Sequence, residues 1–192
     1  MSLLLISFIS LLLLPSIHSN KTIEADKQQA QEAFAFLNAV RANPENYYKE
    51  LHYKKNVKVS PIKLQWNDTL AQVAEAKALD MAKRNYFAHV DPDRNGINYL
   101  VYQSGYELNP DWIKKRKDNY FESISVNPNS GREAISTLII DANEPSLGHR
   151  KHLLGLDAWN STLKDIGIGF VCCNAGCRYK TYVCVIIAKH NW

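Results

Sequence analysis

The sequence lacks the features that mark several large protein classes. Cysteine is absent before position 172, and the formal net charge is only +4, which gives no indication of nucleic-acid binding. Beyond the first 19 residues no segment is long and apolar enough to cross a bilayer. There is no Gly-rich phosphate loop, His-Glu-x-x-His helix or Gly-x-Ser-x-Gly elbow. These absences argue against a nucleotide-binding enzyme, a zinc protease of the usual helical type, an α/β-hydrolase and a protein with stable membrane insertion.

The first 19 residues are typical of a secretory signal peptide. An apolar run is followed by Pro15 and the small residue Ser19, which favours cleavage after Ser19. The run of about 12 residues is short for a membrane-spanning helix, but it has no preceding Lys or Arg, so a retained membrane anchor is the alternative. We therefore expect a secreted, extracellular protein. In that setting the sequons at Asn67 and Asn160 are candidate glycosylation sites.

Residues 20–192 contain no internal repeat and no Pro/Gly-rich linker, which predicts a single domain. Apolar periodicity predicts helices over residues 23–42, from Asn67 or Asp68 to Arg84, and over residues 131–142, with a turn and a short helix in residues 144–155. Residues 165–173 and 181–189 are rich in β-formers and predict a hairpin. This pattern indicates an α+β protein with helices packed on a small, mainly antiparallel sheet.

All four cysteines fall within this predicted hairpin. An even number behind a secretory leader predicts two disulfides. Adjacent cysteines rarely bond to each other, which leaves two arrangements. Either Cys172 bonds Cys177 and Cys173 bonds Cys184, or Cys172 bonds Cys184 and Cys173 bonds Cys177. A four-cysteine zinc site is the alternative to both.

The stretch Asp-Pro-Asp-Arg-Asn-Gly, residues 91–96, resembles the start of a calcium-binding EF-hand loop. Such a loop needs a bidentate glutamate at its twelfth position, and Tyr102 stands there. The objection is strengthened by Pro92 and by the absence of a strong exiting helix. We therefore interpret the stretch as a polar turn, with Asn95-Gly96 supplying the positive φ angles.

Three residues of suitable chemistry for a functional site are His89, Glu122 and His149. Two imidazoles and a carboxylate could bind zinc with an open position for water, or could transfer protons without a metal. His152 is also close to His149 in the sequence, but Arg150 and Lys151 between them disfavour a cation there. We expect His152 to lie on the surface.

Five motifs in order now resemble a known family. They are FLNAVRANP, KLQWNDTLAQVAEAKALDMAKRNYFAHVDPD, NYFESIS, SLGHRKHLLG and DIGIGF, followed by the predicted hairpin. Together they resemble the CAP superfamily, the secreted cysteine-rich secretory, antigen-type and pathogenesis-related (SCP-like) domains, and look closest to its bacterial-type and lower-eukaryote branch. The resemblance implies an α-β-α sandwich with a cleft lined by two histidines and one or two acidic residues.

Carried onto this chain, the family pattern places His89, Glu122 and His149 in that cleft. The fourth position falls on Asp141, with Leu138 where many members have tryptophan, and Glu144 is a second candidate. Glu122 stands in Phe-Glu-Ser rather than the family's Gly-Glu-Asn.

The resemblance implies a binding protein more than an enzyme, and it assigns no catalytic residue. The expected ligands are a divalent cation, zinc or magnesium, in the cleft and a lipid or sterol in apolar grooves. Two alternatives remain. One is a metal-assisted hydrolase in which Glu122 is the general base. The other is a secreted interaction or effector protein with a vestigial cleft, which binds a protein partner through loops such as residues 107–117.

Overall fold

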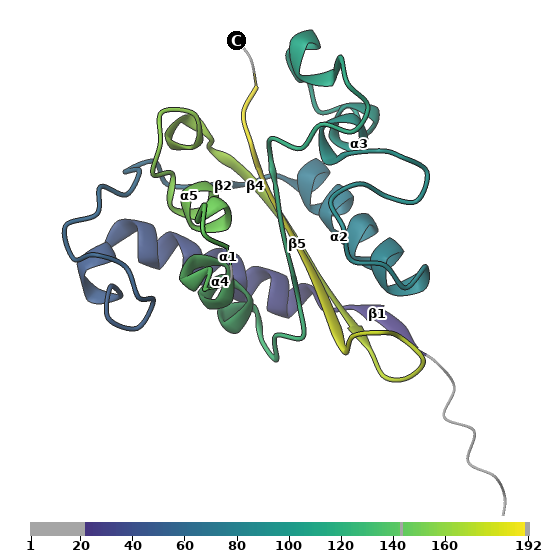
Figure 1. Ribbon diagram of the computed structural model, residues 1–192, viewed down its shortest axis with the longest axis horizontal. Helices are drawn as coiled ribbons and strands as arrows, with labels where there is room; N and C mark the ends of the chain where they lie inside the picture. The colour runs from purple at the N-terminus through teal and green to yellow at the C-terminus, as the bar shows by residue number, and fades with distance from the viewer. Residues whose placement is uncertain (1–21, 143, 191–192) are drawn as a thin grey trace, which may run out of the picture.

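The computed structural model describes residues 22–142 and 144–190, so the predicted leader lies outside the described residues. The fold is a three-layered α+β sandwich, as expected (Figure 1). A central sheet has α1, α4 and α5 on one face and α2 and α3 on the other. None of the helices in the described ranges is long and apolar enough to span a bilayer. The elements are β1 (Ile23–Ala25), α1 (Lys27–Ala42), β2 (Gln65–Trp66), α2 (Asp68–Lys83), α3 (Ile97–Gln103), β3 (Glu122–Val126), α4 (Gly131–Ile140), α5 (Gly148–Leu154), β4 (Asp165–Cys173) and β5 (Thr181–Ala188).

The sheet is mainly antiparallel, and its strands follow the order β1-β4-β5-β3. The predicted hairpin is confirmed: β4 and β5 pair in a continuous register from Asp165–Ala188 to Cys172–Thr181. The short strand β2 pairs with β4 in parallel, beyond the end of β1. Since β3 pairs with β5 alone, it forms one edge of the sheet.

The first helix begins later than its periodicity predicted. Residues Ile23–Ala25 are a strand that pairs with β4, and α1 begins at Lys27. The reason is Asp26, whose carboxylate accepts a hydrogen bond from the backbone N–H of Gln29 at 3.0 Å and so caps the helix. The prediction for α2 was better, because Asn67 caps it in the same way.

The glycines of the DIGIGF motif have a packing role. Gly167 and Gly169 face α2, and a Cβ atom at either position would overlap with backbone atoms of Leu70, Ala71 or Ala74. Helix α2 therefore lies directly against the backbone of β4. This contact fixes the position of the loop that follows α2 and contains His89.

The two-disulfide prediction is wrong in part. The structure has one disulfide, Cys173–Cys177, while Cys172 and Cys184 are free thiols. The strand register explains this, because Cys184 lies opposite Gly169, three residues from Cys172 along β4. Side chains alternate between the faces of a sheet, so an offset of three places Cys172 on the face opposite to that of Cys184.

The Asp-Pro-Asp-Arg-Asn-Gly stretch is a turn, as interpreted, but two details differ. The positive φ belongs to Arg94, at 69°, rather than to Asn95-Gly96, and the short helix α3 follows immediately. Both carboxylate oxygens of Asp91 accept hydrogen bonds from Asn95, at 2.7 and 2.9 Å. Asp91 therefore acts as a turn-forming side chain.

Candidate functional site

An open cleft lies beside the edge strand β3, where segments from both helical layers meet. Its volume is about 410 Å³. Strand β3 contributes neighbouring side chains on opposite faces of the sheet, so Glu122 is directed to the α2 layer and Ser123 to the α5 layer. The cleft is lined by His89, Asn119, Tyr120, Glu122, Ser123, Glu144, Ser146, Gly148, His149, His152, Trp159 and Asn160.

The first half of the site is a pair formed by His89 and Glu122. His89 Nδ1 lies 2.7 Å from Glu122 Oε2, and the Glu122 side chain is fully buried while that of His89 is 41% exposed. The other carboxylate oxygen of Glu122 accepts a hydrogen bond from the Cys184 thiol at 3.4 Å. Burial, together with the charge of Glu122, raises the pKa of Cys184 well above its ordinary value, so this thiol stays protonated and able to donate.

The second half repeats the same arrangement with His149 and Asp141. His149 Nδ1 lies 2.7 Å from Asp141 Oδ1, and the Asp141 side chain is only 3% exposed. Asp141 Oδ2 accepts hydrogen bonds from the backbone N–H groups of His149 and Arg150, at 3.0 and 3.2 Å. Asp141 therefore fixes both the start of α5 and the orientation of the imidazole. Glu144, the second candidate for this position, lines the cleft but bonds to the N–H of Ser146.

The two imidazoles face one another across the cleft, with ring centroids 6.5 Å apart. A carboxylate only accepts hydrogen bonds, so Nδ1 of each ring carries the proton and Nε2 of the neutral ring presents its lone pair. Metal-binding histidines in proteins are commonly held in this way by a carboxylate. Within the described residues no group of three or more His, Cys, Asp or Glu side chains is placed to hold one metal ion, so the donor set is limited to two nitrogens.

Lys77 supports the loop that carries His89, and sequence reasoning missed it. This lysine of α2 is only 2% exposed, and its Nζ donates to the carbonyl oxygen of His89 at 3.0 Å and to the hydroxyl of Tyr86 at 3.2 Å. The Tyr86 hydroxyl donates in turn to Asp80 at 2.6 Å. Lys77 interrupts the apolar stripe of α2, which is the one signal that could have pointed to it.

The expectation that His152 lies on the surface is wrong. His152 is 6% exposed, and its Nδ1 lies 2.8 Å from the hydroxyl of Ser123, with its Nε2 3.4 Å from the carbonyl oxygen of Ile187. Burial lowers its pKa to about 4, so the ring is neutral at physiological pH. The placement of α5 against β3 buries this ring, although its neighbours in sequence are charged.

The two sequons lie in different places. Asn160 lines the cleft, and its side-chain amide donates to Asp157 at 2.7 Å. Asn67 is the residue that caps α2. A glycan on Asn160 would therefore lie at the cleft, whereas one on Asn67 would not. Glycosylation at either position stays a prediction.

Comparison with known proteins gives the family and the fold of the chain. The family model described as CAP, the cysteine-rich secretory protein family, matches residues 34–186. The chain therefore belongs to the CAP family. Its fold is similar to the crystal structure of an extracellular protein containing an SCP domain from Bacillus anthracis str. Ames, with a TM-score of 0.54 and 21% sequence identity. That match covers 85% of this chain and 41% of the Bacillus protein. No curated protein matches the chain.

Proposed function

We propose that this chain is a secreted binding protein whose cleft holds a divalent cation, zinc or magnesium, through Nε2 of His89 and Nε2 of His149. The observation that carries the proposal is the repeated histidine–carboxylate pair, which directs two lone pairs into one cleft from both helical layers. The remaining coordination positions would be left to water or to a ligand. A cation bound there would supply positive charge that attracts anionic groups.

The imidazole donors favour zinc over magnesium. Imidazole nitrogen suits zinc, whereas magnesium prefers oxygen ligands and keeps several waters. Two protein ligands are fewer than the three or four of most zinc sites, so we expect moderate affinity and ready exchange. Glu122 and Asp141 would orient the two imidazole rings through their hydrogen bonds to Nδ1, and each ring would use Nε2 to bind the metal.

The hydrolase alternative is less well supported by the contacts of Glu122. Its Oε2 is bonded to His89 and its Oε1 to Cys184, and the side chain has no exposed surface. A general base must reach a water molecule in the cleft. Binding of a lipid or sterol, and of a protein partner, stays a prediction from the family resemblance.

Calorimetric titration with zinc tests the proposal, using the protein as secreted from a host cell. We expect micromolar binding that is lost in both the His89→Ala and the His149→Ala variants. His52→Asn is the matched control, because His52 is exposed, lies outside the cleft and has a positive φ of 53° that asparagine tolerates. Equal zinc affinity in all four proteins, each folded by circular dichroism, would refute the proposed site.

A further inference from the structure

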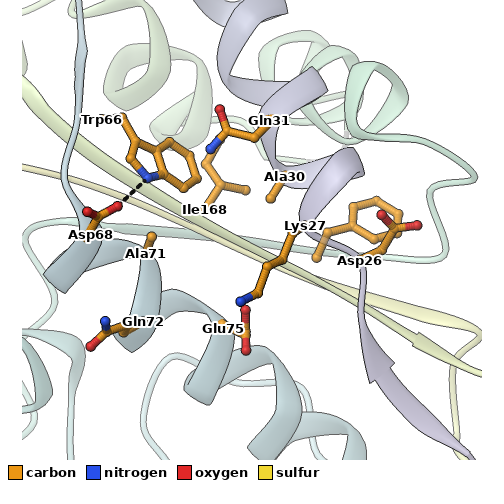
Figure 2. A pocket seen from close by; sticks show the side chains of 11 residues that line it. Asp26, Lys27, Ala30, Gln31, Trp66, Asp68, Ala71, Gln72, Glu75 and Ile168 are labelled. Atoms are coloured by element: carbon orange, nitrogen blue, oxygen red, sulfur yellow. Dashed lines mark hydrogen bonds between the residues drawn. The ribbon is translucent and has the colours of Figure 1, made fainter.

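A second pocket, of about 350 Å³, lies between α1 and α2 beside strand β4 (Figure 2). It shares no lining residue with the histidine cleft. Apolar side chains from both helices and from strands β2 and β4 form part of its wall, namely those of Ala30, Trp66, Ala71, Ile168 and Phe170. Polar and charged side chains complete it, namely those of Asp26, Lys27, Gln31, Asp68, Gln72 and Glu75. The pocket therefore suits a ligand with both apolar and charged parts.

The edge of β4 is uncovered at this pocket. Strand β1 pairs with β4 at residues 171–173 and β2 at residues 165–166, so among the described residues no strand pairs with this edge between them. The carbonyl of Ile166 accepts from Asn67 N at 2.9 Å and that of Phe170 from Asp26 N at 2.8 Å. Both carbonyls therefore point to the β1/β2 side.

Ile168 lies midway between these two residues. Backbone groups alternate in direction along a strand, so its N–H and its C=O point to the same side as the carbonyls of Ile166 and Phe170. Ile168 also lines the pocket. The N–H and C=O of Ile168 are therefore open to the pocket. Together they can form the two hydrogen bonds that one extended residue makes with its partner in an antiparallel sheet.

The charges around the pocket are mainly negative, although the whole chain carries +4. The pocket is lined by three carboxylates, those of Asp26, Asp68 and Glu75, and by one ammonium group, that of Lys27. Asp68 accepts a hydrogen bond from Trp66 Nε1 at 3.0 Å, and Asp26 caps α1. Figure 2 shows the Lys27 side chain extending from α1 toward Glu75 on α2. Glu75 is therefore the carboxylate of this pocket toward which a positively charged side chain already extends.

We propose that this pocket binds a short cationic peptide. One extended residue of the peptide pairs with the N–H and C=O of Ile168. The next residue of the peptide directs its side chain to the opposite face of the sheet, the α2 face, and its positive charge contacts Glu75. Recognition of a peptide main chain by an uncovered strand edge is a recurring binding mode, in which adjoining pockets select the side chains. The combination of uncovered edge, apolar wall and excess of carboxylates at one pocket favours this class of ligand over an anion.

Chemical-shift mapping on the 15N-labelled protein tests the proposal without a variant. The probe is N-acetyl-glycyl-lysine methylamide, whose glycine is the residue that pairs with Ile168 and whose lysine supplies the ammonium group. We expect saturable shifts of the Ile168 amide resonance and of its pocket neighbours. Methylation of the glycine backbone nitrogen, or replacement of lysine by norleucine, should each weaken binding about tenfold, because each removes one polar interaction. Absence of shifts at Ile168, or equal binding of all three probes, would overturn it.

Variants separate the roles of the charges. Glu75→Gln should weaken binding of the lysine probe severalfold. Lys27→Gln should strengthen it, because the change removes a positive charge from the pocket wall that repels a cationic ligand. Glu32→Gln is the matched control, since Glu32 is exposed on α1 and does not line the pocket. Unchanged binding in Glu75→Gln, or tighter binding of the corresponding glutamate probe, would contradict the proposal.

Discussion

At the scale of single residues, Asp141 connects helix α4 with helix α5 and with the candidate metal-binding residue His149. It ends α4 in the left-handed conformation, with φ of 51°, and its carboxylate receives three hydrogen bonds from His149 and Arg150. Asparagine also tolerates this conformation, so Asp141→Asn should preserve the backbone while removing the charge behind the imidazole.

We predict that Asp141→Asn weakens zinc binding about 10- to 100-fold, the usual effect of losing a group that orients a metal ligand. The measurement is calorimetric titration beside a thermal melt. The melting temperature should fall by several degrees, because asparagine replaces one of the two acceptor oxygens by an N–H donor, but the protein should still fold. Asp111→Asn serves as the control, since the Asp111 side chain is 69% exposed and outside the cleft. Zinc affinity equal to that of the unaltered protein would show that Asp141 does not orient a metal ligand.

His152 gives the protein a specific sensitivity to acid. Its pKa is about 4 in the folded protein and about 6.5 in an unfolded chain, so the folded state binds fewer protons between these values. The contribution of this residue to the free energy of unfolding therefore falls as pH drops from about 6.5 to 4. The loss amounts to about 3 kcal/mol at pH 4.

Urea unfolding at pH 7 and at pH 4 measures this loss. Because carboxylates also titrate near pH 4, the comparison is with His152→Gln, which can still hydrogen-bond Ser123 but has no titrating ring. We predict a smaller decrease in the variant. If both proteins lose the same free energy between the two pH values, His152 is not the cause.

At the scale of elements, the contact between α2 and β4 holds the fold's main layers together. Gly169 has no room for a side chain against the backbone of α2. We predict that Gly169→Ala lowers the free energy of unfolding by about 1–3 kcal/mol or more, as overpacking generally does. Denaturant unfolding measures it, and Gly148→Ala is the control, because its nearest neighbour would be the Ser146 hydroxyl at 3.4 Å. Similar stability of the two variants would contradict this explanation of the motif.

Much of the element structure could be predicted from the sequence, for identifiable reasons. Helices α2 and α4 have clear apolar periodicity, α2 has a capping Asn67, and the β4–β5 hairpin is long enough to show its β-formers. The strands β1 and β2 have three and two residues, and α3 has seven. Segments this short carry little periodic signal. Pairing with β4 holds β1 and β2 in place, and packing on α2 holds α3.

The site was predictable only in part. Residue chemistry pointed to His89, Glu122 and His149, but their sequence spacing did not place them together, and Asp141 entered through the family resemblance. The burial of Lys77 and His152 depends on tertiary packing that no local pattern reveals. The disulfide pairing depends on the β4–β5 register, in which a shift of one residue reverses the face of every side chain.

At the scale of the whole molecule, the free thiols give a direct test of that register. We predict that a thiol reagent reacts with two cysteines, Cys172 and Cys184, when the protein is denatured in the absence of reductant. In the folded protein Cys184 should react only after unfolding, because it is fully buried and its pKa is raised. Cys172 is partly exposed and should react first. A denatured protein with no reactive thiol would mean that a second disulfide forms.

The position of the single disulfide has a consequence for where the chain can fold. Cys173 and Cys177 are only four residues apart, so their bond closes a very small loop at the tip of the β4–β5 hairpin. Its effect on the entropy of the unfolded chain is correspondingly small, about 2 kcal/mol. The large core between the sheet and its helices does not depend on that bond. Folding of this domain therefore places little demand on an oxidising compartment, and the chain should reach the same three-layered structure in a reducing one.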